Sequence, residues 1–309
     1  MMAGSSPHTE EQTQPDRESA SLQTNRPRLA EYVKVIIVTI LVAFFLKIFV
    51  IEAYRIPTGS MENTLLVGDF LVVNKLAYGF RTPSRVPFTN VAMPTLRLPI
   101  FGSVHRGDVV VFEYPGPYDE QRPAKQVNYV KRCIGLPGDT VRIVHGSVVV
   151  DGVSLILPPH AKPLDDREVF NSTQRMTLFP PGMSYTQSDY GPVIVPQQGD
   201  TVRLDANSIS LWKVLIEREK HTVLVDGARQ VYIDGEKTDH YVVERSYYFM
   251  LGDNRDNSLD SRYWGFVPDD NIVGEALLVY WSWEADSTAR SVMAKSGRIR
   301  WSRIGTVIR

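Results

Sequence analysis

A long apolar run near the N-terminus constrains this chain more than any other feature of its sequence. Residues 35–46 are apolar except for Thr39, and the run continues past Lys47 through residues 48–51. With a few residues before it, this run forms a helix of roughly 30 Å, the thickness of the hydrocarbon layer of a membrane. Lys47 lies near one end, where its long side chain can reach the interface. The sequence therefore predicts a transmembrane anchor over residues 32–53.

Two other interpretations of this run fit less well. A cleavable signal peptide is disfavoured because residues 1–30 form a long polar leader, and no small-residue cleavage site follows the run. A buried core helix is the remaining alternative. The leader has the composition of a disordered tail. Arg26, Arg28 and Lys34 favour an N-terminus on the inner side of the membrane, with the rest of the chain outside.

The composition limits what can follow the anchor. The 309 residues are 43% hydrophobic and 22% charged, which is enough apolar content for a globular core. Lys and Arg number 34 against 35 Asp and Glu, so there is no basic excess for binding nucleic acid. The single cysteine, Cys133, rules out a disulfide within the chain. We therefore expect a domain that is stabilised by packing and has no nucleic acid partner.

From residue 56 onward the pattern is typical of an all-β protein. Short alternating or β-branched runs are separated by turn residues, and no long helical period competes. Three Asp-Gly pairs, at 151–152, 226–227 and 234–235, can supply the positive φ of hairpin turns. The expected strands include residues 69–74, 108–113, 129–134, 140–144, 147–150, 221–225, 230–233 and 272–281.

A short internal repeat and two loop-rich stretches interrupt this pattern. The sequence Gly-Asp-Thr-Val-Arg occurs at 138–142 and again at 199–203, which a duplicated hairpin or two unrelated strand entries explain equally well. Residues 154–200 are rich in Pro, Ser and Gln and predict an insertion with long loops. Residues 78–105 contain four prolines and predict another extended excursion.

Three segments carry the residues that can do chemistry. Residues 54–65 read YRIPTGSMENTL, residues 129–139 read YVKRCIGLPGD, and residues 252–265 read GDNRDNSLDSRYWG. Each segment alone is explained as a turn, a solvated strand face or a polar loop. Together, in this order and behind an anchor, they resemble the bacterial type I signal peptidases, a family of serine proteases with a Ser/Lys dyad. Residues 106–112 and 300–305 also look like that family.

The resemblance implies a role for each matching residue. Ser60 matches the nucleophile and Lys131 the general base. Thr58, where many relatives have serine, matches the hydroxyl that forms the oxyanion hole with the backbone N–H of Ser60. The residues expected to orient the lysine and brace the site are Ser258, Asp260 and Arg262.

A lysine base needs an unusual environment. Free lysine is protonated at neutral pH, so the pKa of Lys131 must be lowered by burial among apolar groups. Gly59 permits the sharp turn that exposes the Ser60 hydroxyl. The resemblance and strand logic together predict that the substrate adds as an extended strand, with small residues one and three positions before the cut. The expected substrate-binding residues are Ile56, Pro57, Met61, Leu65, Tyr129 and Val130.

The fold class that follows is mainly β: an N-terminal transmembrane helix, then an antiparallel β catalytic core with an inserted second β-rich region. We expect a disordered tail over 1–30, the anchor over 32–53, the catalytic core over 54–150 and 246–309, and the insertion over 151–245. The last part of the core includes a basic C-terminal segment.

The predicted partners are signal-peptide-bearing preproteins and the lipid bilayer. The predicted location is the bacterial cytoplasmic (inner) membrane, crossed once, with the catalytic domain on the extracytoplasmic side. Trp281 and Trp283 can contact lipid or pack in the core.

Other chemistries find less support in the sequence. None of the six histidines lies in the three segments, and there is no Gly-x-Ser-x-Gly or His-Glu-x-x-His pattern, so we expect neither a metal nor a cofactor. One alternative is a Ser/Lys protease of another kind, such as a self-cleaving repressor or a pilin-processing peptidase. Another is a tethered β domain that binds exported chains without cutting them.

Overall fold

The computed structural model describes residues 29–82, 97–98, 102–121, 127–156, 158, 161–162, 177–284 and 298–309. The predicted tail over 1–30 lies almost wholly outside these residues, as do much of the predicted excursion over 78–105 and part of the stretch 154–200. The chain divides into two compact units, one ending at Ala43 and the other comprising Phe44–Arg309.

Helix α1 (Leu29–Phe49) occupies most of the predicted anchor. Its 21 residues span about 30 Å and most of its apolar side chains are exposed, so by length and composition it is a candidate to cross a membrane. The helix ends earlier than residue 53, which corrects the predicted boundary. Ile51–Arg55 is instead strand β1, whose backbone pairs with strand β2.

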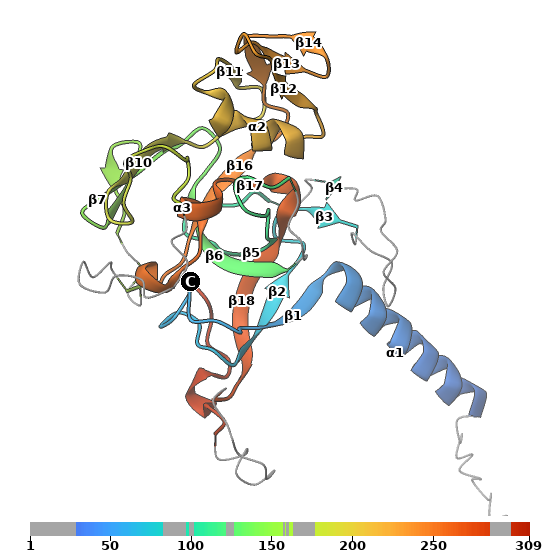
Figure 1. The fold of residues 1–309 in the computed structure, drawn as a ribbon. Helices are drawn as coiled ribbons and strands as arrows, with labels where there is room; N and C mark the ends of the chain where they lie inside the picture. Colours follow the sequence, from blue (N-terminus) through green and yellow to red (C-terminus); the bar gives the residue numbers. More distant parts are fainter. Residues whose placement is uncertain are drawn as a thin grey trace, which may run out of the picture. The chain divides into compact units, whose positions relative to one another are not determined.

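Seven strands form the main sheet, in the order β1-β2-β18-β5-β6-β16-β17 (Figure 1). Neighbouring strands are antiparallel, and the long strand β18 pairs with both β2 and β5, so the last part of the chain joins the first. The bounds are Ile51–Arg55 (β1), Asp69–Asn74 (β2), Val109–Glu113 (β5), Asn128–Gly135 (β6), Tyr247–Leu251 (β16), Val267–Pro268 (β17) and Ile272–Ser282 (β18).

Smaller sheets contain the remaining described strands. A four-stranded sheet has the order β10-β7-β8-β9, a three-stranded sheet β12-β13-β14, and two pairs are β11-β15 and β3-β4. Mostly antiparallel sheets after an apolar helix confirm the predicted fold class. The bounds are Phe80–Arg81 (β3), Arg97–Leu98 (β4), Thr140–Val144 (β7), Ser147–Val150 (β8), Val153–Ser154 (β9), Tyr190–Ile194 (β10), Thr201–Arg203 (β11), Val223–Val225 (β12), Val231–Ile233 (β13), Glu236–Lys237 (β14) and His240–Val242 (β15).

Five short helices complete the described elements. The largest, α2 (Ile209–Arg218), was missed because no long helical period was expected after residue 56. Its buried residues Ile209, Leu215 and Ile216 nevertheless lie on one helical face, which is the amphipathic signal. The others are η1 (Arg255–Asn257), α3 (Ser261–Trp264), η2 (Asp269–Asn271) and η3 (Trp301–Arg303).

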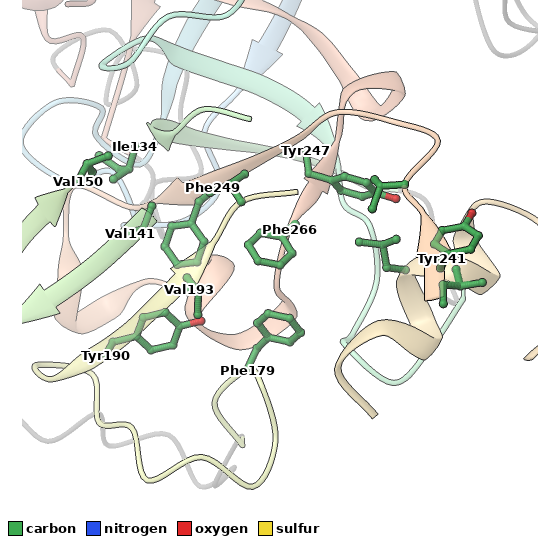
Figure 2. Packing of buried hydrophobic residues seen from close by; sticks show 14 of the residues in the cluster. Ile134, Val141, Val150, Phe179, Tyr190, Val193, Tyr241, Tyr247, Phe249 and Phe266 are labelled. Atoms are coloured by element: carbon green, nitrogen blue, oxygen red, sulfur yellow. The ribbon is translucent and has the colours of Figure 1, made fainter. Parts of the chain in front are cut away.

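One apolar cluster joins the predicted insertion to the main sheet. Phe249 of β16 belongs to the same cluster as Leu215 and Ile216 of α2. Figure 2 shows Phe249 and Phe266 side by side, with Tyr247 next and Tyr241 beyond it. The shared cluster means that residues of the insertion and of the core are buried together.

Four Gly-Asp pairs, at 68–69, 107–108, 138–139 and 199–200, begin strands through the same turn. Each glycine has a φ between +88° and +99°. Each aspartate carboxylate accepts a hydrogen bond from the backbone N–H three residues earlier. Each pair also exchanges two backbone hydrogen bonds with one residue of a neighbouring segment. The repeated Gly-Asp-Thr-Val-Arg sequence therefore marks a shared strand entry, used twice more elsewhere, and not a duplicated hairpin.

The three Asp-Gly pairs all lie between paired strands, but only two act as predicted. Both residues of the pairs 151–152 and 234–235 have positive φ. In the hairpin that joins β12 to β13, the residue with positive φ is Arg229, and Asp226 closes the loop by donating its N–H to the Gln230 carbonyl. The prediction of positive φ at 226–227 is therefore wrong, although the hairpin forms.

Candidate active site

The predicted nucleophile lies in the loop between β1 and β2. Backbone hydrogen bonds from Ile56 to the Asp69 carbonyl (2.8 Å) and from Gly68 to the Ile56 carbonyl (2.9 Å) close the base of this loop. Met61 and Leu65, 1% and 0% exposed, fix its inner side in an apolar cluster. Ser60 is thus held on a closed, anchored loop and is only partly buried.

Lys131 lies on β6 with its side chain directed at this loop. Its Nζ atom is 2.5 Å from Ser60 Oγ, although the two residues are 71 positions apart in the sequence. Lys131 is 3% exposed, and the ring of Tyr129 lies 5.7 Å from the amine. The structure therefore brings together the two residues that were predicted to act on each other.

Burial changes the acid–base behaviour of this amine. Desolvation, with a smaller contribution from Arg262, lowers the pKa of Lys131 from 10.5 to about 8, while Asp260 and Asp253 oppose the change. An amine with such a pKa is uncharged in roughly a tenth of the molecules at neutral pH, far more often than an ordinary lysine. It can then accept a proton from the Ser60 hydroxyl group.

The third segment holds the nucleophile loop by its backbone. The N–H of Asn254 donates to the Ser60 carbonyl (3.1 Å), and its side-chain amide donates to the Gly59 carbonyl (3.1 Å). A trans peptide directs its C=O and N–H to opposite sides, so holding the Gly59 carbonyl directs the Ser60 N–H away from Asn254. Within the described chain, neither this N–H nor the Thr58 hydroxyl has a hydrogen-bond partner, and Thr58 is exposed.

Gly252 allows the third segment to come this close. A Cβ atom there would lie 2.5 Å from the Ser60 carbonyl oxygen and would overlap the Ser258 hydroxyl. The φ of Gly252 is not positive, so the restriction is one of space. Any larger residue at this position would push the third segment away from the nucleophile loop.

Asp260 and Arg262 form a fully buried ion pair behind the site. Two bonds of 2.9 Å join the guanidinium to the carboxylate, which also accepts the N–H of Gly252 (3.2 Å). Burial opposes both charges, but their attraction lowers the pKa of Asp260 and raises that of Arg262. The buried Ser258 hydroxyl has no well-aligned partner among the described residues, yet lies close enough to Asp260 to help lower its pKa.

A second buried ion pair was missed by the sequence analysis. Arg132 donates two hydrogen bonds to Asp253, of 2.8 and 2.6 Å, and the Thr64 hydroxyl donates to the same carboxylate at 2.6 Å. This group ties the lysine strand to the nucleophile loop and to the third segment. All three residues lie inside the quoted segments, but a run of polar residues does not reveal which pairs are buried.

The expected substrate-binding residues occupy different depths. Pro57 is exposed, while Tyr129 and Val130 are partly exposed. Ile56, Met61 and Leu65 are 4%, 1% and 0% exposed and pack in one cluster with Val130 beside them. These three side chains therefore lie beneath the expected substrate-binding surface and support it from the protein interior.

The described residues contain no group of three or more His, Cys, Asp or Glu side chains placed to hold a metal ion. The expectation of a site without metal or cofactor remains a prediction. The chemistry available at the site is that of an alcohol beside an amine, supported by two buried ion pairs.

Comparison with known proteins gives consistent matches along most of the chain. Residues 29–281 match the family described as "Signal peptidase, peptidase S26". The chain is 32% identical over 280 residues to signal peptidase I of Pseudomonas aeruginosa, covering 87% of this chain and 78% of that protein. It is 33% identical over 259 residues to signal peptidase I of Buchnera aphidicola subsp. Schizaphis graminum, covering 80% and 73%. A crystal structure of a signal peptidase I from Enterococcus faecalis V583 matches 56% of this chain and 96% of that one, at 24% identity and a TM-score of 0.24.

Proposed function

This chain belongs to the signal peptidase I family of S26 serine peptidases, and from this membership we propose that Ser60 is its nucleophile and Lys131 its general base. Its activity is the cleavage of signal peptides from the preproteins that carry them. The observation that supports the residue assignment is the 2.5 Å separation of Ser60 Oγ and Lys131 Nζ, with Lys131 3% exposed.

The reaction begins when the uncharged amine of Lys131 takes the Ser60 proton as Oγ attacks the carbonyl carbon of the scissile peptide bond. The C–N bond of the resulting tetrahedral intermediate breaks, and the Lys131 ammonium gives its proton to the departing amine. A water molecule, activated by the same amine, then hydrolyses the acyl ester on Ser60. One lysine thus serves as base, acid and base again.

The oxyanion hole consists of the Ser60 N–H and the Thr58 hydroxyl. Both donors are unoccupied within the described chain, and the hydrogen bonds from Asn254 to the Gly59 and Ser60 carbonyls fix the loop around them. A preorganised pair of donors stabilises the negative charge that develops on the substrate oxygen. The lysine is supported from the protein interior by three buried residues, Ser258, Asp260 and Arg262.

The substrate binds as a strand along the open edge of β6. Residues 128–131 pair with β5 alone among the described strands, whereas β16 pairs with Arg132, Cys133 and Gly135. An unpaired strand edge can bind an extended peptide through backbone hydrogen bonds. The partly exposed Tyr129 and Val130 would then contact substrate side chains, and only small residues would fit next to them.

The enzyme works at a membrane surface. An N-terminal hydrophobic helix is consistent with membrane anchoring. The finer assignment is a single crossing of the bacterial inner membrane, with the catalytic domain on the extracytoplasmic side. Exposed aromatic residues in β18, just after it and in η3 would rest on the lipid, because Tyr280, Trp283 and Trp301 are 41%, 36% and 68% exposed. Phe70 packs against the first two.

Substitution of the two proposed catalytic residues tests the assignment. Purified full-length protein in detergent should cleave a preprotein, whereas Ser60→Ala, Lys131→Met and Lys131→Arg should each lose on the order of a thousandfold in kcat/KM. Methionine keeps an unbranched side chain one atom shorter than that of lysine but has no base, and the guanidinium of arginine cannot be deprotonated. The control is Ser210→Ala on the exposed side of α2, which should cleave like the wild type. Near-normal cleavage by Lys131→Arg would refute the base assignment.

A further inference from the structure

Arg218, the last residue of α2, binds the loop that connects β5 to β6. Its guanidinium donates to the carbonyl oxygens of Gly116 (3.2 Å), Pro117 (2.6 Å) and Glu120 (3.0 Å). The Nε atom makes a second, longer bond of 3.3 Å to the Glu120 carbonyl. A residue of the predicted insertion thus holds three backbone carbonyl groups of a loop that belongs to the catalytic core.

All of these acceptors are backbone carbonyl groups. The planar fork of an arginine can hold several such groups at fixed angles, whereas a lysine ammonium acts as a point charge. Burial lowers the pKa of Arg218 to about 10, which leaves it charged at neutral pH. Because the contacts are to the backbone, they fix the conformation of the loop whatever its side chains are.

The held loop begins and ends next to the catalytic strand. Tyr114 donates its N–H to the Val127 carbonyl (2.9 Å), and its ring stacks on Tyr129 at 4.7 Å between centroids. Trp264 packs against both rings, at 5.2 and 5.4 Å. Tyr129 is the residue whose ring lies 5.7 Å from the Lys131 amine. A path therefore leads from Arg218 to Gly116, along the backbone to Tyr114, and through the stacked ring of Tyr129 to the entrance of the site.

We propose that Arg218 is a positioning residue that fixes residues 116–120 of the β5–β6 connection, and through them and Tyr114 the strand edge at residues 128–130 on which the substrate pairs. The inference rests on the proposed function, since that function assigns the edge to the substrate. It gives the insertion a task in the reaction: α2 sets the geometry of peptide binding. Arg218 touches neither Ser60 nor Lys131, so it acts on substrate binding more than on the chemical step.

Steady-state kinetics on the full-length protein in detergent test this proposal, with a peptide that carries alanine one and three positions before the cut. The variants are Arg218→Gln, which removes the charge, and Arg218→Lys, which keeps the charge but loses the fork. The control is Lys213→Gln on the same helix, whose exposed ammonium pairs with Glu217 alone among the described residues, at 4.0 Å. Thermal unfolding is measured on each variant.

Arg218→Gln should raise KM about tenfold or more, the loss expected for hydrogen bonds from a charged group, with kcat and the pH dependence of kcat close to wild type. The KM of Arg218→Lys should lie between those of the wild type and Arg218→Gln. The KM of Lys213→Gln should not differ from that of the wild type. A lower melting temperature with unchanged KM would make Arg218 merely structural and overturn the proposal. If Arg218→Gln does not fold, the test rests on Arg218→Lys. An unchanged KM in Arg218→Lys also overturns the proposal. Cleavage that survives in Ser60→Ala would instead refute the proposed function.

Discussion

At the scale of single residues, the charge state of Lys131 decides whether the site can react. A buried ammonium without a directly bound carboxylate is unfavourable, and Lys131 Nζ is hydrogen-bonded to the neutral hydroxyl of Ser60. Asp253 and Asp260, the nearby carboxylates, are bound to Arg132 and Arg262. These ion pairs keep the two carboxylates from binding the amine directly, and Arg262 helps to lower the pKa of Lys131, although both carboxylates still raise it.

The pH dependence of cleavage should report this lysine. Lys131 acts as a base only when uncharged, so kcat/KM should rise with pH and level off above the pKa of about 8. The measurement is kcat/KM for a peptide substrate across the range in which the protein stays folded. An acid limb near 10.5, the ordinary value for lysine, would contradict a desolvated base.

Sequence alone predicted the two residues that we propose to react, but not their surroundings. The three motifs predicted Ser60 and Lys131, and the structure places them in contact. The same motifs did not separate Met61, which is buried, from Pro57, which is exposed. Nor did they reveal the pairing of Arg132 with Asp253, 121 positions away, because ion pairs between distant segments depend on strand register.

At the scale of elements, the four Gly-Asp turns show how local sequence sets strand boundaries. The glycine adopts a φ that other residues adopt at a cost, and the aspartate carboxylate accepts the N–H that the turn leaves unpaired. Two of these turns were visible as a repeated pentapeptide. The other two, at 68–69 and 107–108, share only the dipeptide, so their similarity emerges from the hydrogen bonds.

Replacing the glycine of such a turn should destabilise the protein through its backbone alone. Gly199 has a φ of +91° and nothing within 4 Å of an added Cβ, so Gly199→Ala should lower the free energy of unfolding by about 1–2 kcal/mol. Gly227 is the matched control, since it has the same open space but no positive φ. Thermal or chemical unfolding of the two variants gives the comparison, and equal stabilities would show that the turn is not strained by a side chain.

Helix α2 is an element that the sequence pattern did not predict. Its ten residues are bounded by strands and loops, and a short helix in a β-rich chain is easily overlooked. The burial of Ile209, Leu215 and Ile216 against the cluster that contains Phe249 stabilises it. Tertiary packing, more than helix propensity, therefore determines this element.

At the scale of the whole catalytic unit, the buried Asp69 joins segments that lie far apart in the sequence. Its carboxylate accepts hydrogen bonds from Ser282 Oγ (2.6 Å), the Leu66 N–H (2.8 Å) and Arg303 Nη2 (2.6 Å). Ser282 and Arg303 lie 213 and 234 positions along the chain from Asp69. The basic C-terminal segment, whose function the sequence did not reveal, thus anchors the strand that closes the nucleophile loop.

Loss of Asp69 should therefore weaken the fold and the site together. Asp69→Ala leaves the guanidinium of Arg303 without its carboxylate, and breaking a buried pair in this way typically costs roughly 3–5 kcal/mol. Arg303→Ala and the Asp69→Ala/Arg303→Ala double variant complete a double-mutant cycle. We expect a coupling energy well above zero, because the carboxylate and the guanidinium are in direct contact. Unfolding of each full-length variant in detergent gives the free energies.

The control for this cycle is Asp239→Ala, because Asp239 has an exposed side chain that pairs only with the exposed His240 in the described chain. We expect it to unfold like the wild type, since exposed ion pairs contribute little. Asp69→Ala should also reduce kcat/KM, because it removes the carboxylate that accepts the Leu66 N–H in the turn at the base of the Ser60 loop. The backbone of that same turn holds Ile56, whose N–H donates to the carbonyl of residue 69. If Asp69→Ala melted at the wild-type temperature, the C-terminal segment would be packed on the sheet without stabilising it. That result would also contradict the inference that Arg303 supports the Ser60 loop through Asp69.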